Sequence, residues 1–148
     1  MKHPRGDSKM IEISDAIKEG SKAYLKRQNQ TVAGVALVLF LGIAYMLGWL
    51  TAFGFLIGAF SSALAGFLGM MTAVDSNSRT AEAAKSGLSQ AFGLAYKGGA
   101  VTGFLVVGIG LFSVSVFYWF VQDLAPLVGL AFGGSLISVF ARLGGGIY

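Results

Sequence analysis

The stretch TVAGVALVLFLGIAYMLGWLTAFGFLIGAFSSALAGFLGMMTAV, residues 31–74, contains no charged side chain and decides the fold. A helix needs about 20 predominantly apolar residues to cross a bilayer, so this block is long enough for two passes. Gly48 and Trp49 lie near its middle, where a turn residue and an interfacial aromatic side chain are expected. The pattern therefore predicts a hairpin of two transmembrane helices, at residues 31–48 and 53–72.

Two further apolar runs follow, and each is long enough for one more pass. They cover residues 98–120 and 125–142, with Gln122, Asp123 and Pro126 forming the turn between them. Backbone groups in lipid must be satisfied internally, so each span is a helix unless the strands close a barrel. The runs lack the alternation of a barrel strand. We expect an all-α integral membrane protein with four transmembrane helices.

The overall composition agrees with a membrane location. Of the residues, 55% are hydrophobic and 12% are charged, against ~25% charged in a typical soluble domain. The mean hydropathy is +0.70. The sequence has no cysteine, which excludes disulfides and thiolate metal sites. The net charge of +4 is explained by the membrane topology described next, and we expect no nucleic-acid partner.

The basic residues predict the orientation in the lipid bilayer. All eleven lysines and arginines fall in residues 1–30, in residues 75–97 or at Arg142. The predicted turns near Gly48 and Asp123 contain none. Cytoplasmic loops of membrane proteins carry an excess of Lys and Arg. We therefore expect both ends of the chain and the 75–97 connection on the cytoplasmic side.

The two polar segments also have a predicted local structure. In residues 1–30, Asp7 or Ser8 is suited to cap a helix, and apolar residues then recur at helical spacing. An amphipathic helix is expected there, running into the first span. In the connection at residues 75–97, the polar residues 75–78 favour a turn, after which a second amphipathic helix should lead into the third span.

Small residues recur along two of the predicted spans. Glycine makes up 22 of the 148 residues, about twice its average usage, and such an excess in membrane helices indicates close packing. Gly58, Ser62 and Gly66 repeat every fourth residue in the second span, and Gly129 and Gly133 do so in the fourth. We interpret both sets as helix-packing positions. Their partners can lie in this chain or in other helices.

Few side chains here are suited to chemistry. No acidic residue lies in a predicted span, although an ion relay through a membrane generally needs embedded carboxylates or histidine. The single histidine, His3, lies in the polar leader. Neither a phosphate-binding glycine loop nor a Ser/His/Asp set nor a cluster with metal-ligand spacing occurs. We expect no catalytic residue and no metal ligand in this chain.

Arg142 is the one charged residue at the edge of the last span. One interpretation is a membrane anchor whose guanidinium reaches the cytoplasmic interface. In the other, Arg142 faces the interior of a bundle and pairs with an acid on a helix outside this chain. The glycine run at residues 144–146, which permits a bend or a close helix approach, favours the second interpretation.

Six blocks of the sequence, in order, resemble signatures of the membrane-bound inorganic pyrophosphatases. They cover nearly the whole chain, and six motifs with consistent spacing are far more specific than one. The blocks are PRGDSKM (4–10), AIKEGSKAYLKRQ (16–28), GAFSSALAGFLGM (58–70), NSRTAEAAKSGL (77–88), YKGGAVTGFLVVGIGL (96–111) and FARLGGGIY (140–148).

The resemblance implies a pump that hydrolyses pyrophosphate at a cytoplasmic Mg²⁺ site and moves H⁺ or Na⁺, with K⁺ as a second candidate cofactor. Such pumps are homodimers of subunits with about sixteen helices packed in two rings. This chain would supply helices two to five, and residues 143–148 would begin a truncated catalytic segment. The Mg²⁺ and pyrophosphate ligands would lie outside the chain. Arg142 matches the arginine of the family's ion-gate region.

The alternative is a self-contained small four-helix membrane protein, either an assembly subunit or a small exporter. Small exporters rely on an embedded glutamate, and the predicted spans contain none. Under the favoured interpretation the isolated chain would hydrolyse no pyrophosphate.

Overall fold

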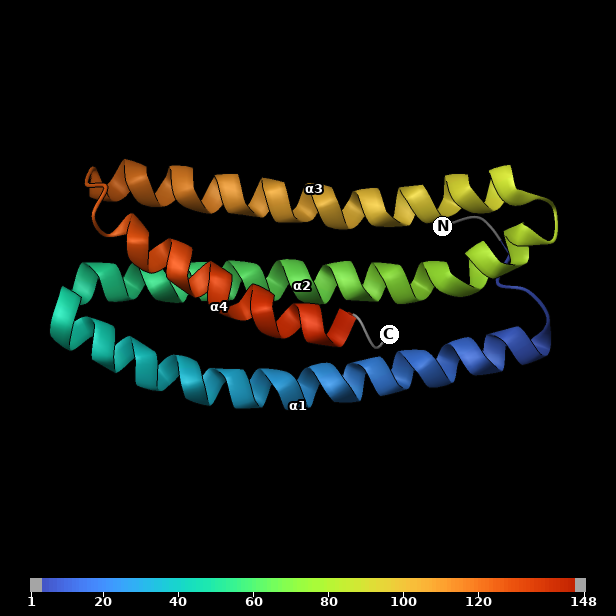
Figure 1. The fold of residues 1–148 in the computed structure, drawn as a ribbon, viewed down its shortest axis with the longest axis horizontal. Helices are drawn as coiled ribbons and strands as arrows, with labels where there is room; N and C mark the ends of the chain where they lie inside the picture. Colours follow the sequence, from blue (N-terminus) through green and yellow to red (C-terminus); the bar gives the residue numbers. More distant parts are fainter. Residues whose placement is uncertain (1–3, 146–148) are drawn as a thin grey trace.

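The computed structural model describes residues 4–145, and side chains within residues 4–139. Its secondary structure over this range is helical, and the helices lie side by side along one long axis (Figure 1). The elements are α1 (Ser8–Leu47), α2 (Trp49–Ala84), α3 (Leu88–Val121) and α4 (Leu127–Gly145). The chain is therefore an all-α bundle, as the uncharged runs predict.

Three of the helices, α1, α2 and α3, are long and apolar enough to cross a membrane. With 40, 36 and 34 residues, they measure about 60, 54 and 51 Å at 1.5 Å per residue, whereas the hydrocarbon core is about 30 Å thick. Each helix must therefore continue beyond the bilayer. The fourth helix is shorter, with 19 residues, and its apolar part in the described range is Leu127–Val139.

The start of α1, the end of α2 and the start of α3 meet at one end of the bundle (Figure 1). We call residues 4–30 and 75–97 the polar end, because the charged residues gather there. Asp7 caps α1 by accepting a hydrogen bond from the backbone of Met10 at 2.9 Å, as its position predicts. Lys18 of α1 and Asp75 of α2 form an ion pair at 2.6 Å.

The turn predicted at residues 75–78 is wrong, because α2 continues through it to Ala84. In the helix, Asp75 reaches Lys18 and the Ser76 hydroxyl donates to the backbone, so these polar side chains are partly satisfied without a turn. The chain turns instead before α3, where Gly87 has a φ of 126° that side chains rarely allow.

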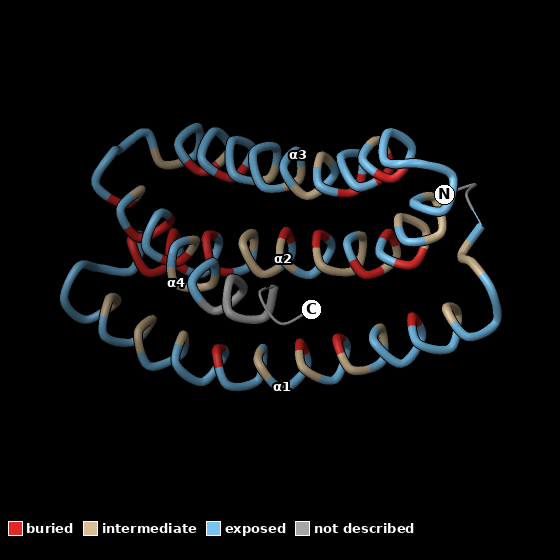
Figure 2. Tube along the Cα trace, turned by 45° about the vertical axis from the view of Figure 1, so that its right-hand side comes forward, coloured by how far each residue is buried: buried red, intermediate tan, exposed pale blue. Residues whose placement is uncertain are grey.

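The centre of the bundle is α2, which contacts each of the other three helices. Phe55 is fully buried, and the buried residues of α2 are spread along its length (Figure 2). Two polar contacts join α2 to α3. The hydroxyls of Ser61 and Ser113 are 2.7 Å apart, and Thr102 donates to the Gly69 carbonyl at 3.4 Å.

Candidate functional site: the α2–α4 contact and the adjoining groove

The closest helix contact joins α2 and α4 through glycine. A Cβ atom placed on Gly129 would overlap the carbonyl oxygen of Thr51, and one on Gly133 would overlap that of Phe55. Both glycines are buried. No side chain fits between the two backbones at these positions, so α4 lies directly against α2.

The contact is reciprocal. A Cβ atom on Gly58 of α2 would overlap the carbonyl oxygen of Leu130 in α4, and one on Gly54 would lie 2.8 Å from that of Pro126. Each helix therefore presents two glycines four residues apart to carbonyl oxygens across the contact, with Pro126 lying just before α4. The geometry directs glycine Cα–H groups at carbonyl oxygens, an arrangement that recurs at helix–helix interfaces. We call these four glycines and the carbonyls they face the glycine lock.

Close contact matters more in lipid than in water. Lipid tails are as apolar as leucine, so helices in a membrane associate through van der Waals packing and polar contacts rather than through hydrophobic burial. Glycine lets backbones approach closely and so gains this packing. The glycine lock therefore fixes the position of the short helix α4 on α2.

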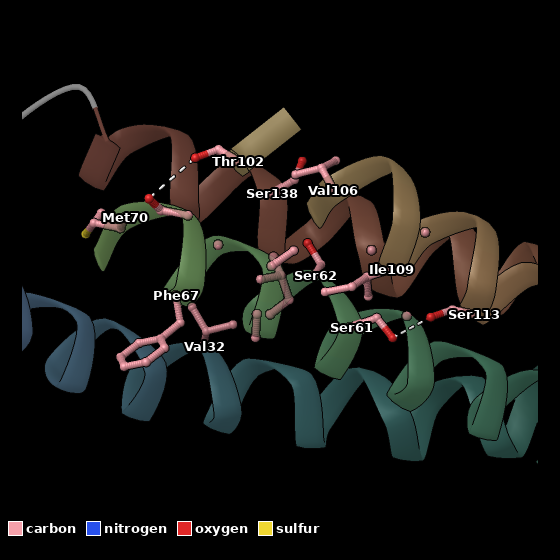
Figure 3. A pocket seen from close by; sticks show the side chains of 18 of the residues that line it. Val32, Ser61, Ser62, Phe67, Met70, Thr102, Val106, Ile109, Ser113 and Ser138 are labelled. Carbon is pink, nitrogen blue, oxygen red and sulfur yellow. Dashed lines mark hydrogen bonds between the residues drawn. The ribbon is translucent and has the colours of Figure 1, made fainter. Parts of the chain in front are cut away.

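The two predicted small-residue stripes have different surroundings. Gly58, Gly129 and Gly133 belong to the glycine lock, and Gly58 also lines a groove of about 750 Å³ together with Ser62 and Gly66. The groove lies among all four helices, and Figure 3 labels residues on its walls, among them Val32 of α1, Ser62 of α2, Val106 of α3 and Ser138 of α4. Its lining is mainly apolar.

Three further glycines lie at close helix contacts that the sequence patterns do not predict. Gly54 lies four residues before Gly58, and that spacing could have identified it. Gly69 and Gly98 bring α2 and α3 together: their Cβ positions would lie 2.7 Å from the Thr102 methyl carbon and 2.9 Å from the Ser76 hydroxyl. Neither belongs to a clear repeat, so only the fold identifies them.

The backbone of Arg142 belongs to α4, but its side chain lies outside the described part of the structure. Within the described residues, no three acidic or histidine side chains are grouped so as to hold a metal ion. We assign the described residues no step in metal-dependent hydrolysis.

At the polar end, charged side chains from different parts of the chain form ion pairs. Lys85, just after α2, lies 2.6 Å from Glu82 and 3.8 Å from Asp7, which precedes α1. The hydrogen bond with Glu82 is the main cause that raises the pKa of Lys85 above its ordinary value. Arg5 also pairs with Asp15 within this end. Of these pairs, Lys85–Asp7 joins the start of α1 to the α2–α3 connection.

The fold and the groove define an apolar helical bundle with membrane-length helices and, in its described residues, no metal cluster. The family model for inorganic H⁺ pyrophosphatase matches residues 1–148. The chain belongs to this family of membrane-bound pyrophosphatases.

Curated relatives match along the whole chain. A K(+)-insensitive pyrophosphate-energized proton pump from Methanosarcina mazei is 49% identical over 150 residues, covering 100% of this chain and 22% of the relative. The protein of that name from Caldanaerobacter subterraneus is 42% identical, covering 97% and 24%. A candidate K(+)-stimulated pyrophosphate-energized sodium pump from Bacteroides thetaiotaomicron is 36% identical, covering 100% and 23%. The chain thus spans under a quarter of these relatives' lengths.

Replacing Gly133 with alanine tests the glycine lock. In a full-length protein carrying this segment, the new methyl group forces α4 away from the Phe55 carbonyl, and we expect a loss of about 1–3 kcal/mol in stability, read from thermal unfolding in detergent. Gly108→Ala is the matched control, because a Cβ there meets no atom within 4 Å. Equal stability of the two variants would contradict a close α2–α4 contact.

Proposed function

We propose that this chain supplies four transmembrane helices of a pump that couples pyrophosphate hydrolysis to ion transport. The observation that carries the proposal is the family match over residues 1–148, together with relatives whose names state this activity. The pump would comprise further helices in a bundle of about sixteen, and two subunits would form a homodimer.

The proton is the ion we favour. The relatives with 40–49% identity are named proton pumps and K(+)-insensitive, whereas those named for sodium are 36% and 38% identical. We therefore propose that pumping by the complete protein does not require K⁺. Mg²⁺ would bind with pyrophosphate on the cytoplasmic side through residues outside this chain.

The small-exporter alternative has a weaker basis. It would require this chain alone to form a transport path, and an embedded acid is the usual means. The acidic residues lie at the polar end or at Asp123 in the α3–α4 turn, away from the apolar middle of the helices. A role as part of a larger pump needs no such residue here.

Hydrolysis and transport can be measured directly. The full-length protein carrying this segment, in sealed vesicles with Mg²⁺ and pyrophosphate, should release phosphate and acidify the vesicle interior, and a protonophore should abolish the acidification. The isolated 148-residue chain should release no phosphate above a detergent blank. An inactive full-length protein, or hydrolysis by the isolated chain, would refute the proposal.

The proposed topology has both ends of the chain and the polar end in the cytoplasm, because the positive charge lies there. Single cysteines at Ser8 and Asp123 test it in a full-length protein from which any cysteine outside this segment has been removed; the segment itself contains none. A membrane-impermeant maleimide added from the cytoplasmic side should label Ser8→Cys and leave Asp123→Cys unlabelled. Labelling of Asp123→Cys from the cytoplasmic side would contradict the proposed topology.

We further propose that Arg142 belongs to the ion path and pairs with a carboxylate on a neighbouring helix. Arg142→Ala would leave that acid unpaired, at a cost of roughly 3–5 kcal/mol if it is buried. We expect pumping to fall about tenfold or more, and at least as far as hydrolysis. Arg142→Lys keeps the charge without the planar fork and should be milder. If Arg142→Ala vesicles pump and hydrolyse pyrophosphate at the rates of the parent, Arg142 is a surface anchor and the proposal fails.

A further inference from the structure

One face of α1 points away from the other helices of the described chain. α1 runs along one side of the bundle, where it packs on α2 and α4 (Figure 1). Val32, which is 5% exposed, marks its packed face, whereas Leu37 and Tyr45 are 60% and 93% exposed. Consecutive residues of a helix are turned by about 100°, so these two lie about 140° round the helix from Val32. We call them, with Lys26 and Arg27 at similar angles, the outer face of α1.

Two basic residues stand where the outer face meets the uncharged block. Lys26 and Arg27 are exposed, and neither forms an ion pair with a described residue. Arg27 is the last charged residue before Asp75. Glu19, the acidic residue of α1 that lies nearest in sequence, precedes Lys26 by about two turns, or about 10 Å along the axis. The two cations therefore have no paired anion within the described residues.

The distances along α1 match one leaflet of a bilayer. At 1.5 Å per residue, Leu37 lies about 15 Å along the axis from Arg27, and half of the hydrocarbon core is also about 15 Å thick. With Arg27 at the level of the lipid phosphates, Leu37 lies at the depth of the acyl chains of the same leaflet. Tyr45, about 27 Å from Arg27, then lies in the opposite leaflet.

An anionic phospholipid has the chemistry that fits this face. Arginine binds phosphate through two parallel N–H donors, and lysine adds a second positive charge. A zwitterionic lipid offers the same phosphate, but its own cation is repelled by the two basic side chains. We propose that Lys26 and Arg27 bind the headgroup of an anionic phospholipid whose acyl chain packs along the outer face past Leu37. The proposal goes beyond the proposed function, because it concerns a bound lipid and does not depend on which ion is pumped.

A photo-crosslinker at Leu37 tests the site. In a full-length protein carrying this segment, Leu37 is replaced by p-benzoyl-phenylalanine, and the protein is reconstituted in vesicles of equal parts phosphatidylglycerol and phosphatidylcholine. Helical side chains point back toward the N-terminus, so the probe lies beside the acyl chain of a lipid held at Lys26. Mass spectrometry of the labelled peptide counts the adducts of each lipid. We expect phosphatidylglycerol adducts to exceed phosphatidylcholine adducts at least fivefold.

Charge variants connect that preference to the basic pair. Arg27→Gln should lower the ratio of the two adducts about fivefold, the equivalent of ~1 kcal/mol for one basic residue near an anionic surface. Lys9→Gln is the matched control, because Lys9 is exposed and lies on the same face about five turns before Arg27, far from the lipid phosphates. The ratio should not change in Lys9→Gln. A probe at Tyr45 should give nearly equal adducts of both lipids.

Equal adducts of the two lipids at Leu37, no lipid adduct, or a crosslink to protein would overturn the proposal. A preference that Lys9→Gln lowers as much as Arg27→Gln would also overturn it, because the effect would then come from the overall charge. Val38, which is 70% exposed, takes the same probe if the Leu37 variant does not assemble. The measurement requires no turnover, so an inactive parent with the expected preference would refute the pump and retain the lipid site.

Discussion

The contact on which this structure depends is the approach of two backbones without side chains between them. Lipid supplies little drive for helices to associate, so α4 is held by what it gains from packing against α2. Gly129 and Gly133 on one side, and Gly54 and Gly58 on the other, make that approach close. Because α2 also contacts α1 and α3, the position of every helix is set relative to this one.

Much of the fold can be read from local composition. The uncharged block at residues 31–74 has room for two helices, and the structure has α1 and α2 there. The sequence predicts the turn between α2 and α3 too early, at residues 75–78. Asp75 and its polar neighbours favour a turn when only nearby residues are considered. The ion pair of Asp75 with Lys18 joins positions 57 apart in the chain, which a local pattern does not reveal.

The candidate site is only partly predictable for a related reason. A four-residue repeat of small side chains identifies a packing face but not its partner. Gly58 contacts α4, and the groove is lined by Gly58 together with Ser62 and Gly66 of the same repeat. α4 crosses α2 obliquely (Figure 1), and the repeat alone does not show where that crossing falls.

The link between α1 and α2 is a single residue, Gly48, with a φ of 93°. An L-amino acid with a side chain rarely adopts this backbone conformation, so substitution there would strain the turn. With no loop to separate them, α1 and α2 form one hairpin whose tip at Gly48 lies at the opposite end of the bundle from the polar end (Figure 1). In the proposed topology, that tip would be the part of the hairpin that crosses the bilayer, while both polar arms stay in the cytoplasm.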